Sequence, residues 1–165
     1  MTDAVEYKPP LRIVAFDLGI HFAVATNIGG PAEVQRVDFK DPATRNGMLM
    51  QMLRTLIEQA AGAIDVVILE RPFGSKFVAA DKVLFGQAAI IDAVFTLAGI
   101  PVLSLVPADI KRRSTGKGNA DKAMMLAAAK RQGYAGTDEH CADAWCLLKV
   151  GEATIISKPA KGLKP

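Results

Sequence analysis

The stretch LRIVAFDLG at residues 11–19 places a mostly apolar run directly before Asp17, and the stretch IDVVILE at residues 64–70 does the same before Glu70. Short apolar runs rich in β-branched residues are typical of buried strands. A carboxylate at the end of such a strand must be paired, hydrogen-bonded or bound to a cation. Taken singly, each acid is also compatible with a cap or a turn. If the two strands are neighbours, both carboxylates come within reach of one Mg²⁺ ion, which prefers oxygen ligands.

Around these two strands, hydrophobic spacing predicts a chain of strands followed by alternating helices and strands. We expect strands at residues 11–16, 21–26, 32–39, 64–69 and 102–106. We expect helices at residues 46–61, 81–98, 120–132 and 138–150, and a loop at residues 107–119. This order predicts an α/β fold with a mixed sheet and helices on both faces.

Length and composition favour one folded domain. The chain has 165 residues, of which 50% are hydrophobic and 22% charged, so extensive disorder is not expected. No apolar stretch approaches the ~20 residues that span a bilayer, and the start lacks an apolar export signal. We expect a domain at residues 11–150, a flexible start at 1–10 and a basic, disordered tail at 151–165. Cys141 and Cys146 point apart on a helix, which predicts free thiols in a cytoplasmic protein.

A third acidic segment, DEHCADAW at residues 138–145, completes a candidate site. His140 and Asp143 lie three residues apart, on one face of the predicted helix. Acids in an exposed first turn are an equally good reading of this segment alone, because the helix macrodipole favours them. Together with Asp17 and Glu70, however, the segment supplies three carboxylates and one imidazole. Such a set is typical of nucleases that hydrolyse phosphodiesters with two metal ions.

The basic residues are concentrated in one segment. The net charge is only +3, yet residues 107–132 contain seven Lys and Arg side chains against two acids. Such a segment indicates either a surface that binds a polyanion or a solubilising surface.

Six short segments, in order, resemble the RuvC family of Holliday-junction resolvases, which have an RNase H-like nuclease fold. They are FDLG at 16–19, ILERPF at 68–73, LFGQA at 84–88, IKR at 110–112, GKGNADKA at 116–123 and ADA at 142–144. The resemblance covers about residues 11–150. It implies a five-stranded mixed sheet and a metal-dependent crossover junction endodeoxyribonuclease that acts as a homodimer on four-way or branched DNA. The setting implied is the cytoplasm of a bacterium or a phage-infected cell, with no membrane and no nucleotide cofactor.

The resemblance also assigns roles to individual residues. Asp17, Glu70 and Asp143 match the metal-binding acids of the family, and His140 matches its fourth catalytic residue, so all four are expected to bind metal. The metal implied is Mg²⁺, with two ions per site, and Mn²⁺ is expected to substitute.

Further residues match positions that contact DNA or the second subunit. Phe73 matches an aromatic residue that inserts at the junction centre. The remaining expected DNA contacts are Lys111, Arg112, Lys117 and Lys122. The helix that carries Gly86 and Gln87 resembles the dimer-forming helix. The chain departs from the family where Leu18 replaces a proline and where Arg71-Pro72 follows the glutamate, which puts the sequence preference and substrate range in question.

Three alternatives remain open. Another RNase H-like nuclease, acting on general branched DNA or on RNA, would use the same metal chemistry. A non-catalytic junction-binding protein would be expected to lack one of the acids, and all four site positions are filled here. A phosphate-binding ATPase domain could use Asp17-Leu18-Gly19, although the chain is short for the paired domains of that class.

Overall fold

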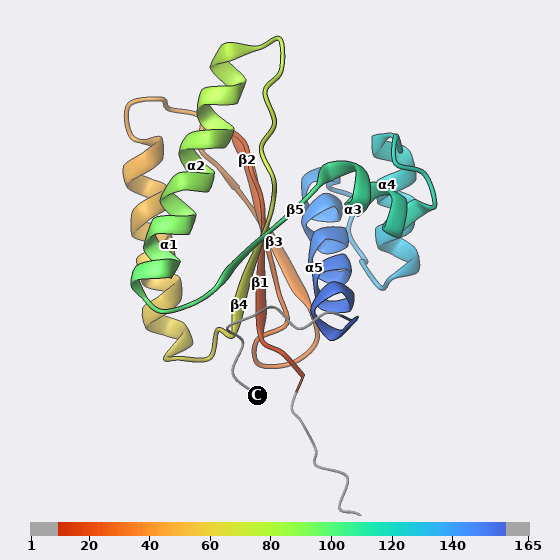
Figure 1. The fold of residues 1–165 in the computed structure, drawn as a ribbon, viewed down its shortest axis with the longest axis horizontal. Helices are drawn as coiled ribbons and strands as arrows, with labels where there is room; N and C mark the ends of the chain where they lie inside the picture. The colour runs from red at the N-terminus through yellow and green to blue at the C-terminus, as the bar shows by residue number, and fades with distance from the viewer. Residues whose placement is uncertain (1–9, 158–165) are drawn as a thin grey trace, which may run out of the picture.

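The computed structural model describes residues 10–157 as one sheet with helices on both faces (Figure 1). The strands are β1 (Ile13–Asp17), β2 (His21–Thr26), β3 (Glu33–Asp38), β4 (Val66–Glu70) and β5 (Val102–Leu105). The helices are α1 (Arg45–Ala60), α2 (Val78–Leu97), α3 (Pro107–Thr115), α4 (Lys122–Arg131) and α5 (Glu139–Ser157). Among these described residues, no helix combines the length and apolar character that crossing a membrane requires.

The sheet has the strand order β3-β2-β1-β4-β5. Strands β1, β2 and β3 pair antiparallel, whereas β4 lies parallel to both β1 and β5. The predicted mixed five-stranded sheet with flanking helices is therefore confirmed. Because β1 and β4 run in the same direction, their carboxyl ends meet at one edge of the sheet.

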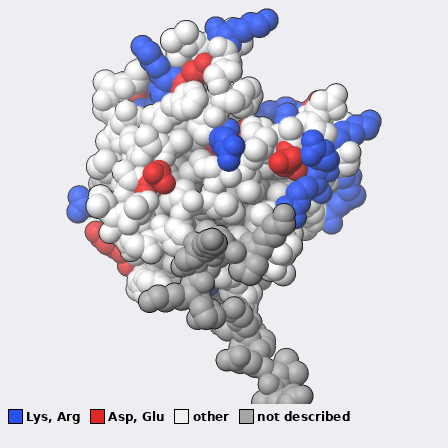
Figure 2. Space-filling view, in the orientation of Figure 1, with Lys and Arg blue, Asp and Glu red and all other residues white. Residues whose placement is uncertain are grey.

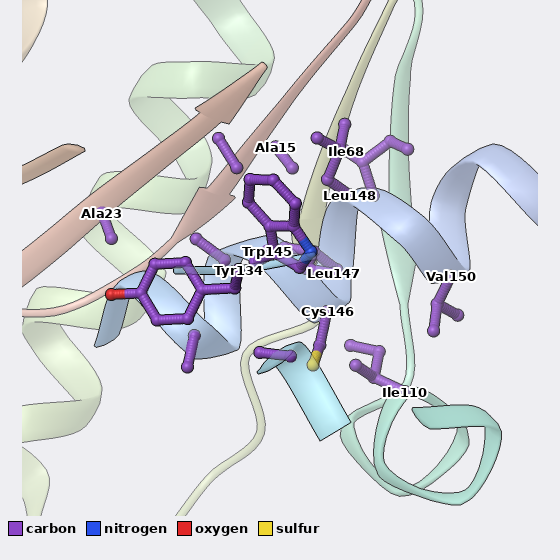
Figure 3. Packing of buried hydrophobic residues seen from close by; sticks show 14 of the residues in the cluster. Ala15, Ala23, Ile68, Ile110, Tyr134, Trp145, Cys146, Leu147, Leu148 and Val150 are labelled. Carbon is purple, nitrogen blue, oxygen red and sulfur yellow. The ribbon is translucent and has the colours of Figure 1, made fainter. Parts of the chain in front are cut away.

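Alternation along the strands divides the core into two layers. In β1, Val14 and Phe16 pack toward α1 and α2, where they meet buried residues such as Leu53 and Phe95. Ile13 and Ala15 point to the opposite face and pack under α5 together with α3 and α4. Figure 3 shows Ala15, Ile68, Trp145 and Leu148 in this second layer. The next residue of the same parity in β1 is Asp17, so its side chain belongs to the α5 face.

One predicted loop is a helix in its first half. Residues 107–119 are rich in polar side chains, but Pro107–Thr115 forms α3. A proline at the first helical position is pre-organised for helix, and Asp109 and Arg113 lie where the helix dipole favours an acid and a base. Gly116 ends the helix in the left-handed conformation. These end signals outweigh the polar composition that predicted a loop.

The last helix is longer than expected. The sequence predicts that it ends near Val150, but α5 continues to Ser157 because Ile155 is buried in the α5-side core. The predicted tail therefore does not begin at residue 151. Apart from Pro10, the predicted flexible start and the rest of the predicted tail lie outside the described residues. Cys141 and Cys146 are buried and unpaired, as predicted.

Helix α5 approaches the sheet closely because small residues lie at the contact. Ala15, Ala23 and Ala25 line the sheet beneath it. At Gly151, a Cβ atom would lie 2.0 Å from Cδ1 of Ile68, which is less than any real contact. The helix can therefore lie this near to β4 only with glycine at this position.

We predict that Gly151→Ala lowers the free energy of unfolding by about 1–3 kcal/mol, because overpacking displaces α5 or Ile68. Removing the clashing methyl with Ile68→Val in the same chain should recover part of that loss. Gly47→Ala is the matched control, since it lies in α1 with nothing within 4 Å of the new Cβ. Denaturant unfolding of the wild type and these three variants tests this, and equal effects of the two single alanine substitutions would contradict the close approach.

Candidate active site

The two strand-end acids lie side by side. Parallel pairing sets Phe16 opposite Leu69, so the next residues of the two strands, Asp17 and Glu70, lie at the same edge. Both have the parity of residues that pack toward α5, such as Ala15 and Ile68. The condition set by the sequence, that the two strands be neighbours in the sheet, is therefore met.

Helix α5 brings the other two predicted residues to this edge. Nδ1 of His140 lies 3.5 Å from a carboxylate oxygen of Asp17. Asp143, one turn further along, forms an ion pair with Lys122 at the start of α4. Only 17% of the Asp17 side chain and 20% of the Asp143 side chain are exposed. The four residues that the sequence singled out thus surround one site, formed by two strands and one helix.

Negative charge accumulates at this site. Burial, followed by the charges of Asp17 and Asp143, raises the pKa of Glu70 to about 7, although Lys111 and Lys122 act in the opposite direction. Burial also raises the pKa of Asp17, against the hydrogen bond from His140. That same bond raises the pKa of His140, although partial burial opposes it. The site is therefore a place where positive charge is favoured.

The donor set suits a hard divalent cation, because carboxylate oxygens predominate and the excess negative charge calls for neutralisation. Asp17, Glu70 and Asp143 would supply the oxygens, and His140 would supply a nitrogen. In the part of the chain that the structure describes, no group of three or more His, Cys, Asp or Glu side chains is already gathered closely enough to hold an ion. Lys122 contacts Asp143 and His140 contacts Asp17.

The residues predicted to contact DNA differ in how near they lie to the acids of the site. Lys122 touches Asp143 directly, and Lys111 on α3 is near enough to act on the charge of Glu70. Arg112 is exposed and pairs with Asp109 at 2.6 Å, whereas Lys117 is exposed in the following turn. Figure 2 shows Lys and Arg side chains gathered over the region of α3 and α4. Phe73, in the segment after β4, has 61% of its surface exposed, so it is not part of the core.

A second polar network adjoins the site, and the sequence did not predict it. The ring of His21 lies 5.1 Å from that of His140, and His21 also contacts Asp38 and Arg36. Arg36 reaches Asp138 at 2.8 Å, and Asp138 accepts a hydrogen bond from the backbone N–H of Cys141. Arg36 thereby connects β3 to Asp138, the residue immediately before the helix that carries His140.

Strand alternation could have revealed part of this network. His21 has the parity of Ala23 and Ala25, which face α5, and Arg36 has the parity of Val34, which also packs there. The pairing between Arg36 and Asp138 joins residues far apart in the chain, so no local pattern indicates it.

No protein-family model and no curated protein matches the chain. Among solved structures, RuvC of Thermus thermophilus in complex with a Holliday junction substrate is similar, with a TM-score of 0.70 and 19% identity over 89% of this chain and 96% of that one. Another Thermus thermophilus RuvC structure gives 0.66 and 19%, covering 89% and 97%. The yeast mitochondrial Holliday junction resolvase Ydc2 gives 0.64 and 13%, covering 93% and 84%. The chain therefore has the fold of the RuvC-type resolvases, within the RNase H-like class, as its sequence predicts.

Proposed function

We propose that the chain is a structure-specific endonuclease that resolves four-way DNA junctions by metal-dependent hydrolysis of phosphodiester bonds. The observation that carries the proposal is the convergence of Asp17, Glu70, His140 and Asp143 at one sheet edge. The fold adds support, since similar structures include a RuvC solved with a Holliday junction substrate. Nothing in the described residues favours an RNA substrate or a purely binding role.

The four site residues take distinct roles in this proposal. Asp17, Glu70 and Asp143 hold Mg²⁺, or Mn²⁺ in its place, and His140 completes the set beside Asp17. Metal ions held by these residues would supply activation of the attacking water and stabilisation of the leaving oxygen. Lys122 pairs with Asp143 in the structure, and its ammonium would be available to contact a phosphate if Asp143 were engaged with metal instead. Lys111, Arg112 and Lys117 neutralise the DNA backbone, and Phe73 stacks on unpaired bases at the branch point.

Assembly into a dimer matches the substrate, because a four-way junction needs two symmetric cuts and a C₂ dimer presents two identical sites. Helix α2 offers the surface. Its residues Ile91 and Phe95 are buried in the chain's own core, so they are not available for the interface. The exposed face contains Lys82, Phe85, Ala89 and Asp92, at helical spacing.

This exposed face is complementary to a second copy of itself. If two α2 helices pair antiparallel about a two-fold axis at the level of Gln87, Lys82 lies opposite Asp92 and Phe85 lies opposite Ala89. Each contact then joins opposite charges, or a large side chain and a small one, and each occurs twice.

The catalytic prediction concerns the acids. Asp17→Asn and Asp143→Asn should each lower cleavage of a synthetic four-way junction by at least about a hundredfold in Mg²⁺. Junction binding without metal should persist, since the substitutions only remove negative charge. Linear duplex and an RNA–DNA hybrid serve as parallel substrates, and Glu58→Gln, on exposed α1, is the matched control. Preferential cutting of the hybrid would reject junction resolution, and wild-type rates in both variants would reject the metal site.

The charge at the site predicts a pH-dependent stability without metal. Because the pKa of Glu70 rises from 4.5 to about 7 on folding, protonated Glu70 favours the fold below pH 4.5, and this contribution is lost as the pH rises through 7. Glu70→Gln is neutral at every pH. In EDTA it should match the wild-type melting temperature near pH 4.5 and exceed it at pH 8, by about 2–4 °C for each kcal/mol. The difference in melting temperature between Glu58→Gln and the wild type should not change with pH. If the difference for Glu70→Gln did not change with pH either, the argument would be refuted.

The dimer prediction uses charge exchange on α2. Lys82→Glu and Asp92→Lys should each weaken self-association, because each sets like charges opposite one another twice, and the double variant should restore it. Phe85→Ala should weaken the free energy of self-association by about 2 kcal/mol or more, as loss of a buried aromatic anchor does. Sedimentation equilibrium measures the association, with Lys130→Glu on α4 as the control. A wild-type chain that stays monomeric with and without junction DNA would exclude the dimer.

A further inference from the structure

Gln87 is the only fully buried polar side chain among the residues described, 10–157. It lies in α2, on the opposite side of the sheet from α5. Both ends of its amide are used by a single residue, Gly19. The Gly19 N–H donates to Oε1 of Gln87 at 2.7 Å, and Nε2 of Gln87 donates to the Gly19 carbonyl at 2.9 Å. The side chain thus pairs with the backbone as a neighbouring strand would.

Gln87 pairs with Gly19 just beyond the point where the strand pairings of β1 end. The parallel ladder with β4 extends only to Phe16 and Leu69, and the antiparallel ladder with β2 ends with Asp17 opposite Ala23. Gly19 follows two residues later, with a φ of 139° that side chains other than glycine rarely adopt. Beyond Asp17 the pairings of β1 have ended, and the Gly19 backbone bonds to the Gln87 side chain instead.

A comparison with Ile91 separates what Gln87 contributes by packing from what it contributes by hydrogen bonding. Ile91, one turn further along α2, is also fully buried but only packs. An apolar side chain at position 87 would fill space without the cost of burying an amide. What the amide adds is a fixed position for the backbone of Gly19.

We propose that Gln87 is a positioning residue for the metal site, acting through Gly19 on Asp17. By holding the chain just beyond Asp17, it keeps the end of β1 from fraying and keeps the Asp17 carboxylate beside His140. Its effect on catalysis rests on the proposed nuclease function, whereas its effect on the backbone does not. Because the Gln87 side chain is fully buried and lies across the sheet from α5, it can influence the site only through Gly19.

The experiment compares three variants. Gln87→Met has a similar volume and no hydrogen-bonding amide, Gln87→Glu keeps an oxygen for the Gly19 N–H, and Ile91→Ala removes buried packing from the same helix. Hydrogen exchange of the Gly19 amide is measured by NMR without metal or DNA. The Mg²⁺ concentration that gives half-maximal thermal stabilisation is measured next, with Mg²⁺ alone. Single-turnover junction cleavage and junction affinity complete the set.

We expect Gln87→Met to speed exchange at Gly19 about tenfold while the Ala15 amide stays protected. The Mg²⁺ midpoint should rise about tenfold, and the cleavage rate should fall about tenfold to a hundredfold with junction affinity unchanged. Gln87→Glu should retain part of the Gly19 protection, and Ile91→Ala should lose melting temperature without changing the midpoint.

The proposal is overturned if Gln87→Met shows the wild-type exchange rate at Gly19 and the wild-type Mg²⁺ midpoint. It is also overturned if Ile91→Ala, at the same melting temperature as Gln87→Met, shows the same shift in the Mg²⁺ midpoint. If the wild-type chain neither cuts junctions nor responds to Mg²⁺, the nuclease function fails. The exchange at Gly19 still decides whether Gln87 holds this backbone.

Discussion

The parallel register between β1 and β4 is the constraint on which the rest of the site depends. A shift of one residue along either strand would turn Asp17 or Glu70 toward α1 and α2, and would bring apolar side chains out of their core layer. The apolar residues that precede each acid are buried on both faces of the sheet, so such a shift costs the hydrophobic stabilisation of both layers. The same burial that stabilises the fold therefore fixes the two carboxylates side by side.

The clustered acids of the site lower the stability of the folded chain when they are ionised. Three carboxylates near one another and partly buried disfavour the ionised state, and the raised pKa values of Asp17 and Glu70 report this tension. Lys122 and His140 relieve it in part through their contacts with Asp143 and Asp17. Perturbed carboxylates of this kind are typical of functional sites, and here the apolar layers on both faces of the sheet supply the compensating stability.

The sequence predicts the sheet and the four central residues because each leaves a local trace. An acid after an apolar run is anomalous, and His140 with Asp143 has helical spacing. Helix α3 was missed because its polar residues resemble a loop, although its proline, Asp109 and Gly116 were helix-end signals. The extension of α5 depends on Ile155 finding the core, and the partners of Arg36 and Gln87 are distant in sequence. These contacts exist only once the tertiary fold is formed, so no local pattern contains them.

The site draws its parts from both ends of the described chain, with Asp17 in the first strand and Asp143 in the last helix. During synthesis the N-terminal strands leave the ribosome first, and a nascent chain holding β1 to β4 has two acids but no α5 to complete the set. The parallel pairing of β1 with β4 is also non-local, because β2, β3 and α1 lie between the two strands in the chain. The four residues of the candidate site therefore come together only after α5 has been synthesised. A chain that ended after β4 would contain Asp17 and Glu70 but neither His140 nor Asp143.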